Sequence, residues 1–402
     1  MLATDPANAA DVAVATPPPP VPDDGDVLHL FVGDAETYDS NLYRLASSVN
    51  PATAIAPNAT RSDTFNTATL GGQGQWLLGR QVFDLTLHVD ENRFARNDLL
   101  NNTDGDGKVL WNWVVGSPLS GQLGVEYNRA LAAFSQTLYL GRDLVDTKDY
   151  FGNLRYHLGP HWSLYGAARN SEYTHSASAV QYNNLRYNTG DGGIEYDTGV
   201  GRTFGLEYDY STGSYPQNYV LNGAVLDRNY REQSPRVVVD YAFTEKTSLA
   251  GYAGYYTRDY RDPAIGRFTG VIWRFKLDWR PTDKTDLVAE TWHELHAYSV
   301  SQADYFVSRG VSISPVWNYS EKLTLSAAAS FEQQNYIASS TSVLLVGGRT
   351  DKLTGEQINA LYTLRQNLYI NAFFRNEQRT SPVKGFRYND QLATVSVTFR
   401  FW

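Results

Sequence analysis

The sequence predicts an all-β fold, and three observations lead to this prediction. Apolar and polar residues alternate along most of the chain, as in "WRFKLDWR" at 273–280, where every second residue is apolar. Successive side chains of a strand point to opposite faces, so such a stretch has one apolar and one polar face. Phe, Trp and Tyr make up 13% of the residues, and these residue types favour strands. The breaks between alternating segments are short and long in turn.

The alternation of short and long connections predicts a transmembrane, up-and-down antiparallel β-barrel. Outer-membrane barrels have short periplasmic turns and long extracellular loops. Many of the alternating segments reach the roughly 9 to 11 residues that cross a bilayer, whereas soluble strands cluster near 5 to 6. No apolar run approaches the roughly 20 residues of a membrane-spanning helix. The alternative is a soluble β-sandwich or propeller, in which the apolar face would form a core.

We expect about 18 strands, and 16 or 20 also fit the pattern. The expected strands lie at 27–36, 64–76, 80–94, 107–115, 119–133, 146–158, 161–175, 182–197, 202–215, 228–243, 247–260, 267–280, 285–298, 304–319, 322–337, 352–364, 367–379 and 390–402. The expected short turns lie at 78–81, 116–119, 159–161, 198–201, 244–247, 281–284, 320–322 and 365–367. Long loops are expected at 96–108, 214–229, 337–351 and 376–390. Residues 34–63 form either the first outer loop or a plug that folds inward.

The two ends of the sequence differ in character. Residues 1–26 are rich in Ala, Pro and Asp and show no periodicity, which predicts a disordered, Pro-rich periplasmic tail before a barrel at 27–402. The chain ends "ATVSVTFRFW", in which Val395, Val397 and Phe399 alternate with polar residues. This ending resembles the C-terminal signal of outer-membrane barrels, although Trp402 is one step out of phase. The outer membrane of a bacterium is therefore the expected location.

Composition and motifs argue against several other functions. The chain has no Cys, which excludes disulfide scaffolds, thiol catalysis and Cys-ligated zinc. The net charge of −9 argues against nucleic-acid binding. His293 and His296 of "HELH" would point to opposite faces of a strand, so we expect no metal site there. "NNTDGDGK" at 101–108 resembles part of a calcium loop but lacks its terminal Glu, and we expect a solvated extracellular loop. No nucleophile motif is evident, so we expect neither an enzyme nor a cofactor.

In this prediction the apolar face meets lipid and the polar face lines a lumen, because about 16 to 18 strands leave an aqueous channel unless loops fill it. The predicted lumen-lining residues are Asp84, His88, Glu126, Arg155, Tyr165, Arg169, Glu195, Glu207, Asp209, Arg236, Asp240, Tyr252, Arg274, Lys276, Asp278, Glu332, Arg365, Arg375 and Arg400. One interpretation is that their charges pair and keep the lumen hydrated. The other is that Tyr, Arg and carboxylates suit a hydrated sugar polymer, since sugar rings stack on aromatics.

Several segments resemble a known family. They are "VLHLFVGDAETYDSNLYRL" at 27–45, which contains "YDSNLYR", then "RSD" at 61–63, "GRQ" at 79–81 and "WNWVVGSPLSGQLGVEYNRALAAF" at 111–134. They are similar to the outer-membrane β-barrel porin family of EpsL-type exopolysaccharide-export proteins. The resemblance covers about residues 27 to 402.

This resemblance implies a pore that exports a secreted polysaccharide, and we expect the barrel to be a monomer. It also implies two partners, a periplasmic polysaccharide-export protein and an inner-membrane polymerase or copolymerase, beside the lipids and lipopolysaccharide of the membrane. The residues themselves leave two alternatives open. One is a general or substrate-specific uptake porin, and the other is a structural or adhesin barrel with a closed lumen.

Overall fold

The computed structural model describes residues 26–221, 224–263, 265, 267–297, 305–337 and 348–401. The predicted tail at 1–26 lies outside the described residues except for Asp26, and so do most of the expected loop at 337–351 and the terminal Trp402. No helix in the described part of the chain is long and apolar enough to cross a membrane.

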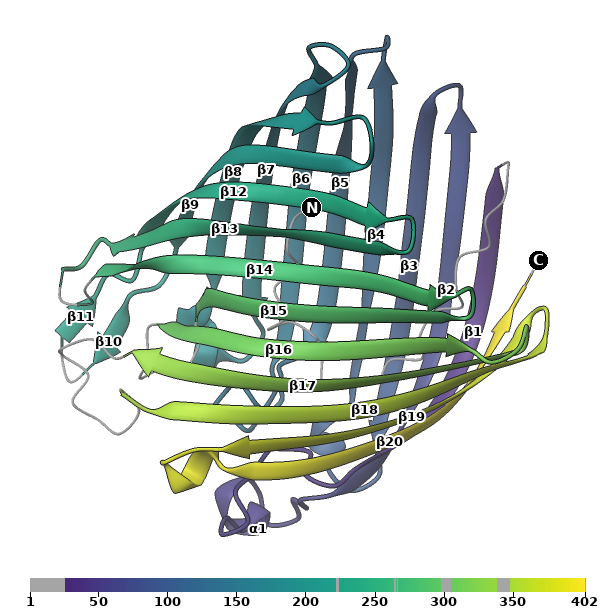
Figure 1. The fold of residues 1–402 in the computed structure, drawn as a ribbon. Coiled ribbons are helices and arrows are strands. Elements are labelled where there is room, and N and C mark those ends of the chain that lie inside the picture. Colours follow the sequence, from purple (N-terminus) through teal and green to yellow (C-terminus); the bar gives the residue numbers. More distant parts are fainter. Residues whose placement is uncertain are drawn as a thin grey trace.

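Eighteen long antiparallel strands form one closed sheet, which confirms the predicted barrel and its strand number (Figure 1). Each strand pairs with the next along the chain, and β1 pairs with β20 to close the barrel. The strands are β1 (Val27–Asp39), β2 (Asp63–Leu78), β3 (Gln81–Phe94), β4 (Asn102–Val115), β5 (Leu119–Leu131), β6 (Leu144–His157), β7 (Trp162–His175), β8 (Leu185–Asp197), β9 (Arg202–Ser214), β12 (Tyr230–Thr244), β13 (Thr247–Tyr260), β14 (Arg267–Thr282), β15 (Thr285–Ala297), β16 (Tyr305–Asn318), β17 (Leu323–Ile337), β18 (Thr350–Arg365), β19 (Leu368–Thr380) and β20 (Tyr388–Arg400).

The two ends of the barrel differ as predicted. Short turns lie at one end, together with the start of β1 and the end of β20. Long connections lie at the other end, and they contain α1 (Pro51–Ala54), η2 (Asp98–Leu100), η3 (Ser178–Asn183), the hairpin β10 (Tyr219–Leu221) and β11 (Ala224–Leu226), and η4 (Lys384–Phe386). The end with short turns faces the periplasm in outer-membrane barrels, and this fixes the orientation.

The prediction of long loops at 96–108 and 376–390 is wrong in part. β4 begins at Asn102, so "TDGDG" belongs to a strand and only 95–101 connects it to β3. Asp104 and Asp106 alternate with two glycines, which is the period of a strand with one polar face, and they pair with β3 and β5. At the other site β19 runs to Thr380 and β20 begins at Tyr388.

Large apolar side chains cover the outside of the barrel. Leu206, Val237 and Ile358 are 63%, 54% and 60% exposed, although each lies in the middle of a strand. Trp162, Trp279 and Trp317 lie near the short-turn ends, on the same apolar face. Such an apolar band with aromatic residues at its edge is typical of a lipid-facing surface. It would be aberrant for the solvent face of a soluble sandwich.

Candidate functional site: the lumen wall and the extracellular mouth

A contact across the barrel identifies the inner face of the wall. The guanidinium of Arg379 donates to the carbonyl of Ser135 over 2.8 Å. Arg379 belongs to β19, whereas Ser135 follows β5, and β20 and β1 to β4 separate these strands around the wall. The contact therefore crosses the mouth, and the face of β19 that carries Arg379 is the inner one. Because directly paired residues point to the same side, the register assigns the inner face of every other strand.

This register places the predicted lumen residues on the inner face, with one exception. The side chains of Asp84, Glu126 and Arg169, for example, point to the inner face. Arg365 is the last residue of β18, beyond a register irregularity at Thr363, and is exposed at the periplasmic rim. It is not part of the wall, because strand alternation ends where the turn begins.

The inner wall from β6 to β15 carries a connected network of ion pairs and tyrosines. Arg155 contacts Glu195, the Tyr165 hydroxyl donates to Glu207 over 2.8 Å, and Arg236 lies 3.5 Å from Glu207 and 3.6 Å from Asp209. Tyr187 donates to Glu232 over 2.7 Å, and Arg274 lies 2.6 Å from Glu294, which Tyr252 also contacts. This arrangement agrees with the interpretation that the charges pair and keep the lumen hydrated.

A glycine makes one of these contacts possible. Tyr165 of β7 reaches Glu207 of β9 by passing over Gly193 of β8. A Cβ atom at position 193 would lie 2.6 Å from the Cζ atom of Tyr165. The glycine of "GDGG" therefore serves close side-chain packing on the inner wall.

Carboxylates outnumber cations on the inner faces of β3 to β17. The carboxylates are Asp84, Asp90, Asp104, Asp106, Glu126, Asp149, Asp191, Glu195, Glu207, Asp209, Glu232, Asp240, Asp278, Asp286, Glu290, Glu294 and Glu332. Apart from Arg280, which lies at the register irregularity beside the short turn of β14, the Lys and Arg residues of the same faces are Lys108, Arg155, Arg169, Arg236, Arg258, Arg274 and Lys276, and each has a carboxylate partner. Fixed charge of one sign lowers the energy of counter-ions in a channel. The lumen should therefore attract cations.

The wall formed by β16 to β20, β1 and β2 is mainly neutral and polar at mid-height. Its inner side chains there are mostly hydroxyls and amides beside glycines, and the charged exceptions are Arg375, opposite Gln357, and Glu332. The hydroxyls and amides include Ser312, Ser330, Gln357, Asn359, Asn371, Thr394, Ser396 and Thr69. The lumen thus has one charged sector and one sector that offers uncharged hydrogen-bonding groups.

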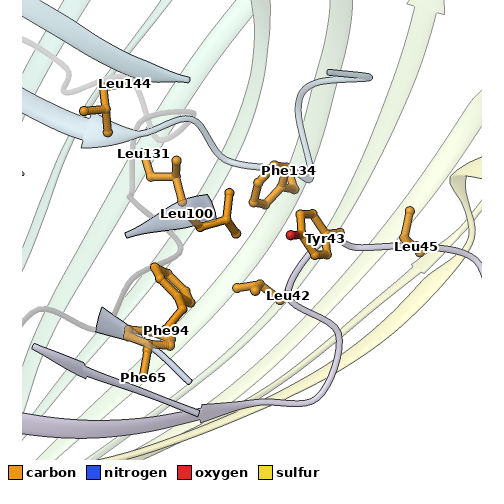
Figure 2. Close-up of a cluster of buried hydrophobic side chains, with 9 residues drawn as sticks. All are labelled: Leu42, Tyr43, Leu45, Phe65, Phe94, Leu100, Leu131, Phe134 and Leu144. Carbon is orange, nitrogen blue, oxygen red and sulfur yellow. The ribbon is translucent and has the colours of Figure 1, made fainter. Parts of the chain in front are cut away.

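The segment at 40–62 folds inward over the extracellular mouth. Leu42, Tyr43 and Leu45 join a buried apolar cluster with the inner-face side chains of Phe65 and Phe94 (Figure 2). The other members of this cluster are Leu100, Leu131, Phe134 and Leu144. Of the two alternatives for 34–63, the structure therefore has the inward one. Residues 34–39 are the exception, because they belong to β1.

Tyr43 is the centre of this packing. Its ring lies 4.9 Å from that of Phe134 in the β5–β6 loop (132–143), and its hydroxyl donates to the Oδ1 atom of Asn97 over 3.2 Å. Burial, with a smaller contribution from the Asp63 carboxylate, raises the pKa of Tyr43 to about 12. The hydroxyl therefore stays protonated and keeps its role as a donor. Two loops that are distant in sequence thus meet over the mouth.

Buried ion pairs fasten the segment to the seam between β1 and β20. The guanidinium of Arg44 lies 2.9 Å from Asp39 at the end of β1 and 3.1 Å from Asp390 in β20. The side-chain amide of Asn41 donates to the Asn389 carbonyl over 3.0 Å. The side chains of Arg44, Asp39 and Asp390 are nearly inaccessible to solvent. Such a set resists opening, because separating it would leave charges buried without partners.

A second buried set lies beside the first on the rim of the mouth, at the ends of β17 to β19. Arg379 lies 2.6 Å from Asp351 and donates to the Tyr336 hydroxyl over 2.6 Å. Arg349 also pairs with Asp351, at 3.0 Å, and its guanidinium stacks on Tyr336 and Phe386. Because Arg379 also holds the Ser135 carbonyl, this set fixes the β5–β6 loop across the mouth.

Sequence reasoning missed these mouth residues as functional groups. Asp39, Asn41 and Arg44 lie within "YDSNLYR", a segment that resembles the family but predicts no role for these residues. Arg44 has a φ of 53°, a conformation that residues other than glycine seldom adopt. A run of Asp, Asn and Arg directly after a strand was the available signal. It could not name Asp390 as a partner, because that contact is long-range.

No metal site is evident in the lumen. Among the described residues, no group of three or more His, Asp and Glu could hold a metal ion. His293 faces outward and stacks on Trp273 with ring centroids 4.5 Å apart, whereas His296 faces inward and its ring lies 5.2 Å from that of Phe306. The two histidines of "HELH" thus lie on opposite faces. His88 lies 3.1 Å from Asp90 and 2.9 Å from Asp106 on the inner wall.

Comparisons with known proteins agree with this geometry. A family described as "Putative beta-barrel porin 2" matches residues 236–401. The structure of OccK2 (OpdF) from Pseudomonas aeruginosa in complex with glucuronate is similar, with a TM-score of 0.50, 10% identity, and 94% of this chain and 98% of that chain covered. OpdK of Pseudomonas aeruginosa with vanillate has a TM-score of 0.50 and 9% identity, with 93% and 99% covered. The chain is a β-barrel of the bacterial outer membrane with the fold of porins, and the family match covers its C-terminal part.

Other comparisons add less to this assignment. A BenF-like porin from Pseudomonas fluorescens Pf-5 has a TM-score of 0.49 and 12% identity, with 94% of this chain and 99% of that chain covered. No curated protein sequence matches this chain. The expected EpsL-type identity and polysaccharide export find no support in the family match or in the OccK2 structure.

Proposed function

We propose that this porin takes up small hydrophilic solutes, and that its lumen favours cations and neutral solutes over anions. The observation that carries the proposal is the mouth, where the segment at 40–62 and the β5–β6 loop meet above the lumen. A secreted polymer needs an open path to the cell surface, whereas buried ion pairs at Arg44 and Arg379 hold these loops in place. The narrowed mouth therefore favours uptake of small solutes over polymer export.

The charges of the lumen support the second half of the proposal. The similar structures of OccK2 and OpdK have glucuronate and vanillate, which are carboxylates. In this porin Arg155, Arg236 and Arg274 each contact a carboxylate of the wall. An incoming carboxylate would have to displace one of these partners and approach a wall with an excess of acids. We therefore propose a different solute class for this porin.

Cation selectivity is the direct test of the charge argument. In planar bilayers under a KCl gradient, we expect the reversal potential to show preference for K⁺ over Cl⁻. Asp240 faces the lumen, is exposed and has no ion-pair partner among the described residues, so Asp240→Asn should reduce this preference. Glu356 is exposed on the outer face of β18, and Glu356→Gln should leave it unchanged. An anion-selective wild-type channel would contradict the proposal.

Solute size tests the role of the mouth. In liposome-swelling assays we expect the wild-type porin to pass monosaccharides and amino acids and to exclude polysaccharides. The double variant Leu42→Ser, Tyr43→Ser removes two side chains of the apolar cluster, and replacing 41–61 by a Gly/Ser linker of equal length removes the segment. Both changes should raise the single-channel conductance and the size limit. Retained heat-modifiable migration on a gel would show that the barrel has formed.

The alternatives predict other outcomes in the same assays. Wild-type porin that passes polysaccharides as readily as monosaccharides would support export and overturn uptake. A wild-type barrel without conductance would support a closed structural or adhesin barrel, the third function that the residues leave open.

A further inference from the structure

A hollow of about 790 Å³ lies on the lipid-facing side of β3 to β8. Most of its lining belongs to the outer face in the register of these strands. The outer-face lining residues are Phe83, Val109, Trp111, Leu123, Val125, Tyr150, Gly152, Ala168, Asn170 and Asn188. The hollow is therefore not part of the lumen.

Small residues on β6, β7 and β8 create this hollow. Gly152, Ala168 and Gly190 lie side by side in one cross-strand row, and Gly166 and Gly192 are neighbours in the next row. A Cβ atom at position 166, 190 or 192 would meet no atom closer than 3.6 Å. The fold therefore does not require glycine at these positions. Tyr150 of β6 and Trp111 of β4 also line the hollow.

Between the small residues and the extracellular loops, the outer face first carries polar side chains and then a row of charged side chains with more cations than acids. The side chains of Asn170 and Asn188 hydrogen-bond each other over 2.7 Å directly above the small residues. The next row outward pairs Lys148 with Glu172 and Glu172 with Arg186. Arg186 lies 3.2 Å from Glu172, and Lys148 is exposed with no ion-pair partner among the described residues.

We propose that this surface binds lipopolysaccharide of the outer leaflet. On β6 to β8 the amide and charged rows lie on the long-loop side of the small residues, which is the side of that leaflet, whereas on β3 and β4 the hollow reaches Phe83 and Trp111 near the short turns. Its depth profile, from small apolar residues through amides to cations, matches acyl chains, sugar hydroxyls and phosphates of one amphiphile. Basic groups at the membrane surface attract anionic lipid headgroups. Acyl chains fill the space above Ala168, and the phosphates of lipid A contact Lys148 and Arg186.

A second charged row on the same barrel provides a matched control. Arg231 of β12 pairs with Asp259 of β13, and Asp259 pairs with Arg267 of β14, so the order of charges is the same. Below this row the outer face carries Tyr255 and Trp273, and the hollow does not extend there. This row therefore shows the effect of the charges alone, without the hollow.

The test is a titration of detergent-folded porin with purified lipopolysaccharide, followed by intrinsic Trp fluorescence and native mass spectrometry. We expect saturable binding by the wild type. Lys148→Glu should weaken it about 5- to 30-fold, since each charge near the headgroups is worth about 1 kcal/mol. Ala168→Leu, which fills the hollow, should weaken it to a similar extent. Arg267→Glu and Ala372→Leu, on the outer face of β14 and β19, should change it less than twofold.

Each contrary result has a defined meaning. If Lys148→Glu and Arg267→Glu lowered the affinity for lipopolysaccharide equally, the attraction would be unspecific, and the proposal would be overturned. Equally tight binding of phosphatidylglycerol vesicles would show that any anionic lipid suffices, and it would overturn the assignment to lipopolysaccharide. Wild-type dimers that Ala168→Leu dissociates would identify a second copy of the chain as the occupant. Unchanged single-channel conductance in all variants would show that the lumen and the proposed uptake function are not involved.

Discussion

Replacing Arg258 by alanine should lower the free energy of unfolding of the porin by about 3–5 kcal/mol, the usual cost of breaking a buried ion pair. The side chains of Arg258 and Glu232 are 4% and 2% exposed and contact each other on the inner wall. The Tyr187 hydroxyl donates to the same carboxylate, and the Arg258 guanidinium stacks on Tyr230 at 4.4 Å. Truncation of Arg258 would leave the carboxylate of Glu232 buried without its cation.

Urea unfolding in lipid vesicles measures this effect. The double variant Arg258→Met, Glu232→Gln removes both charges and should be less destabilised than the single variant, because no unpaired charge is left. Arg93→Ala breaks the exposed pair with Glu91, at 2.6 Å, on the outer surface and should cost less than about 1 kcal/mol. If Arg258→Ala and Arg93→Ala lowered the free energy of unfolding equally, Glu232 would have to be hydrated in the folded barrel.

The strands could be predicted from the sequence because apolar and polar residues alternate along each of them. One face of the strand meets lipid and the other meets water. β13 lies at 247–260, as predicted, and most other boundaries differ by only a few residues. β4 is the main exception. Asp and Gly disfavour strands in soluble proteins, but Asp104 and Asp106 face a hydrated lumen and Gly105 and Gly107 face outward. The composition of "TDGDG" therefore predicts a loop where the barrel has a strand.

The inner face of the wall could be predicted for the same reason, but its contacts could not. Alternation identifies which side of a strand Tyr165 or Arg155 occupies, and it says nothing of a partner two strands away. The mouth depends on contacts with no periodic signal, such as that between Arg44 and Asp390. The resemblance to exporters predicted an open path for a polymer. It gave no information on the inward fold of the segment that contains "YDSNLYR".

Placing arginine at Phe275 should destabilise the folded barrel by about 2–4 kcal/mol, the cost of a charge on the lipid face near the bilayer midplane. Phe275 lies in the middle of β14 on the outer face, between Gly251 of β13 and Thr291 of β15. Neither neighbour carries an acid that could pair with an arginine. Urea unfolding in lipid vesicles measures this loss. The amount of assembled barrel in the outer membrane of cells should also decrease.

The matched change is Lys276→Ser, one residue along the same strand. Lys276 faces the lumen and lies 3.2 Å from Asp278, with both side chains about one-third exposed. Because such a hydrated pair contributes at most about 1 kcal/mol, the variant should fold normally. Loss of the cation leaves Asp278 unpaired, so K⁺ selectivity should rise. Equal destabilisation by Phe275→Arg and Lys276→Ser would mean that the lipid and lumen faces have been assigned wrongly, and every argument from lumen charge would fall with them.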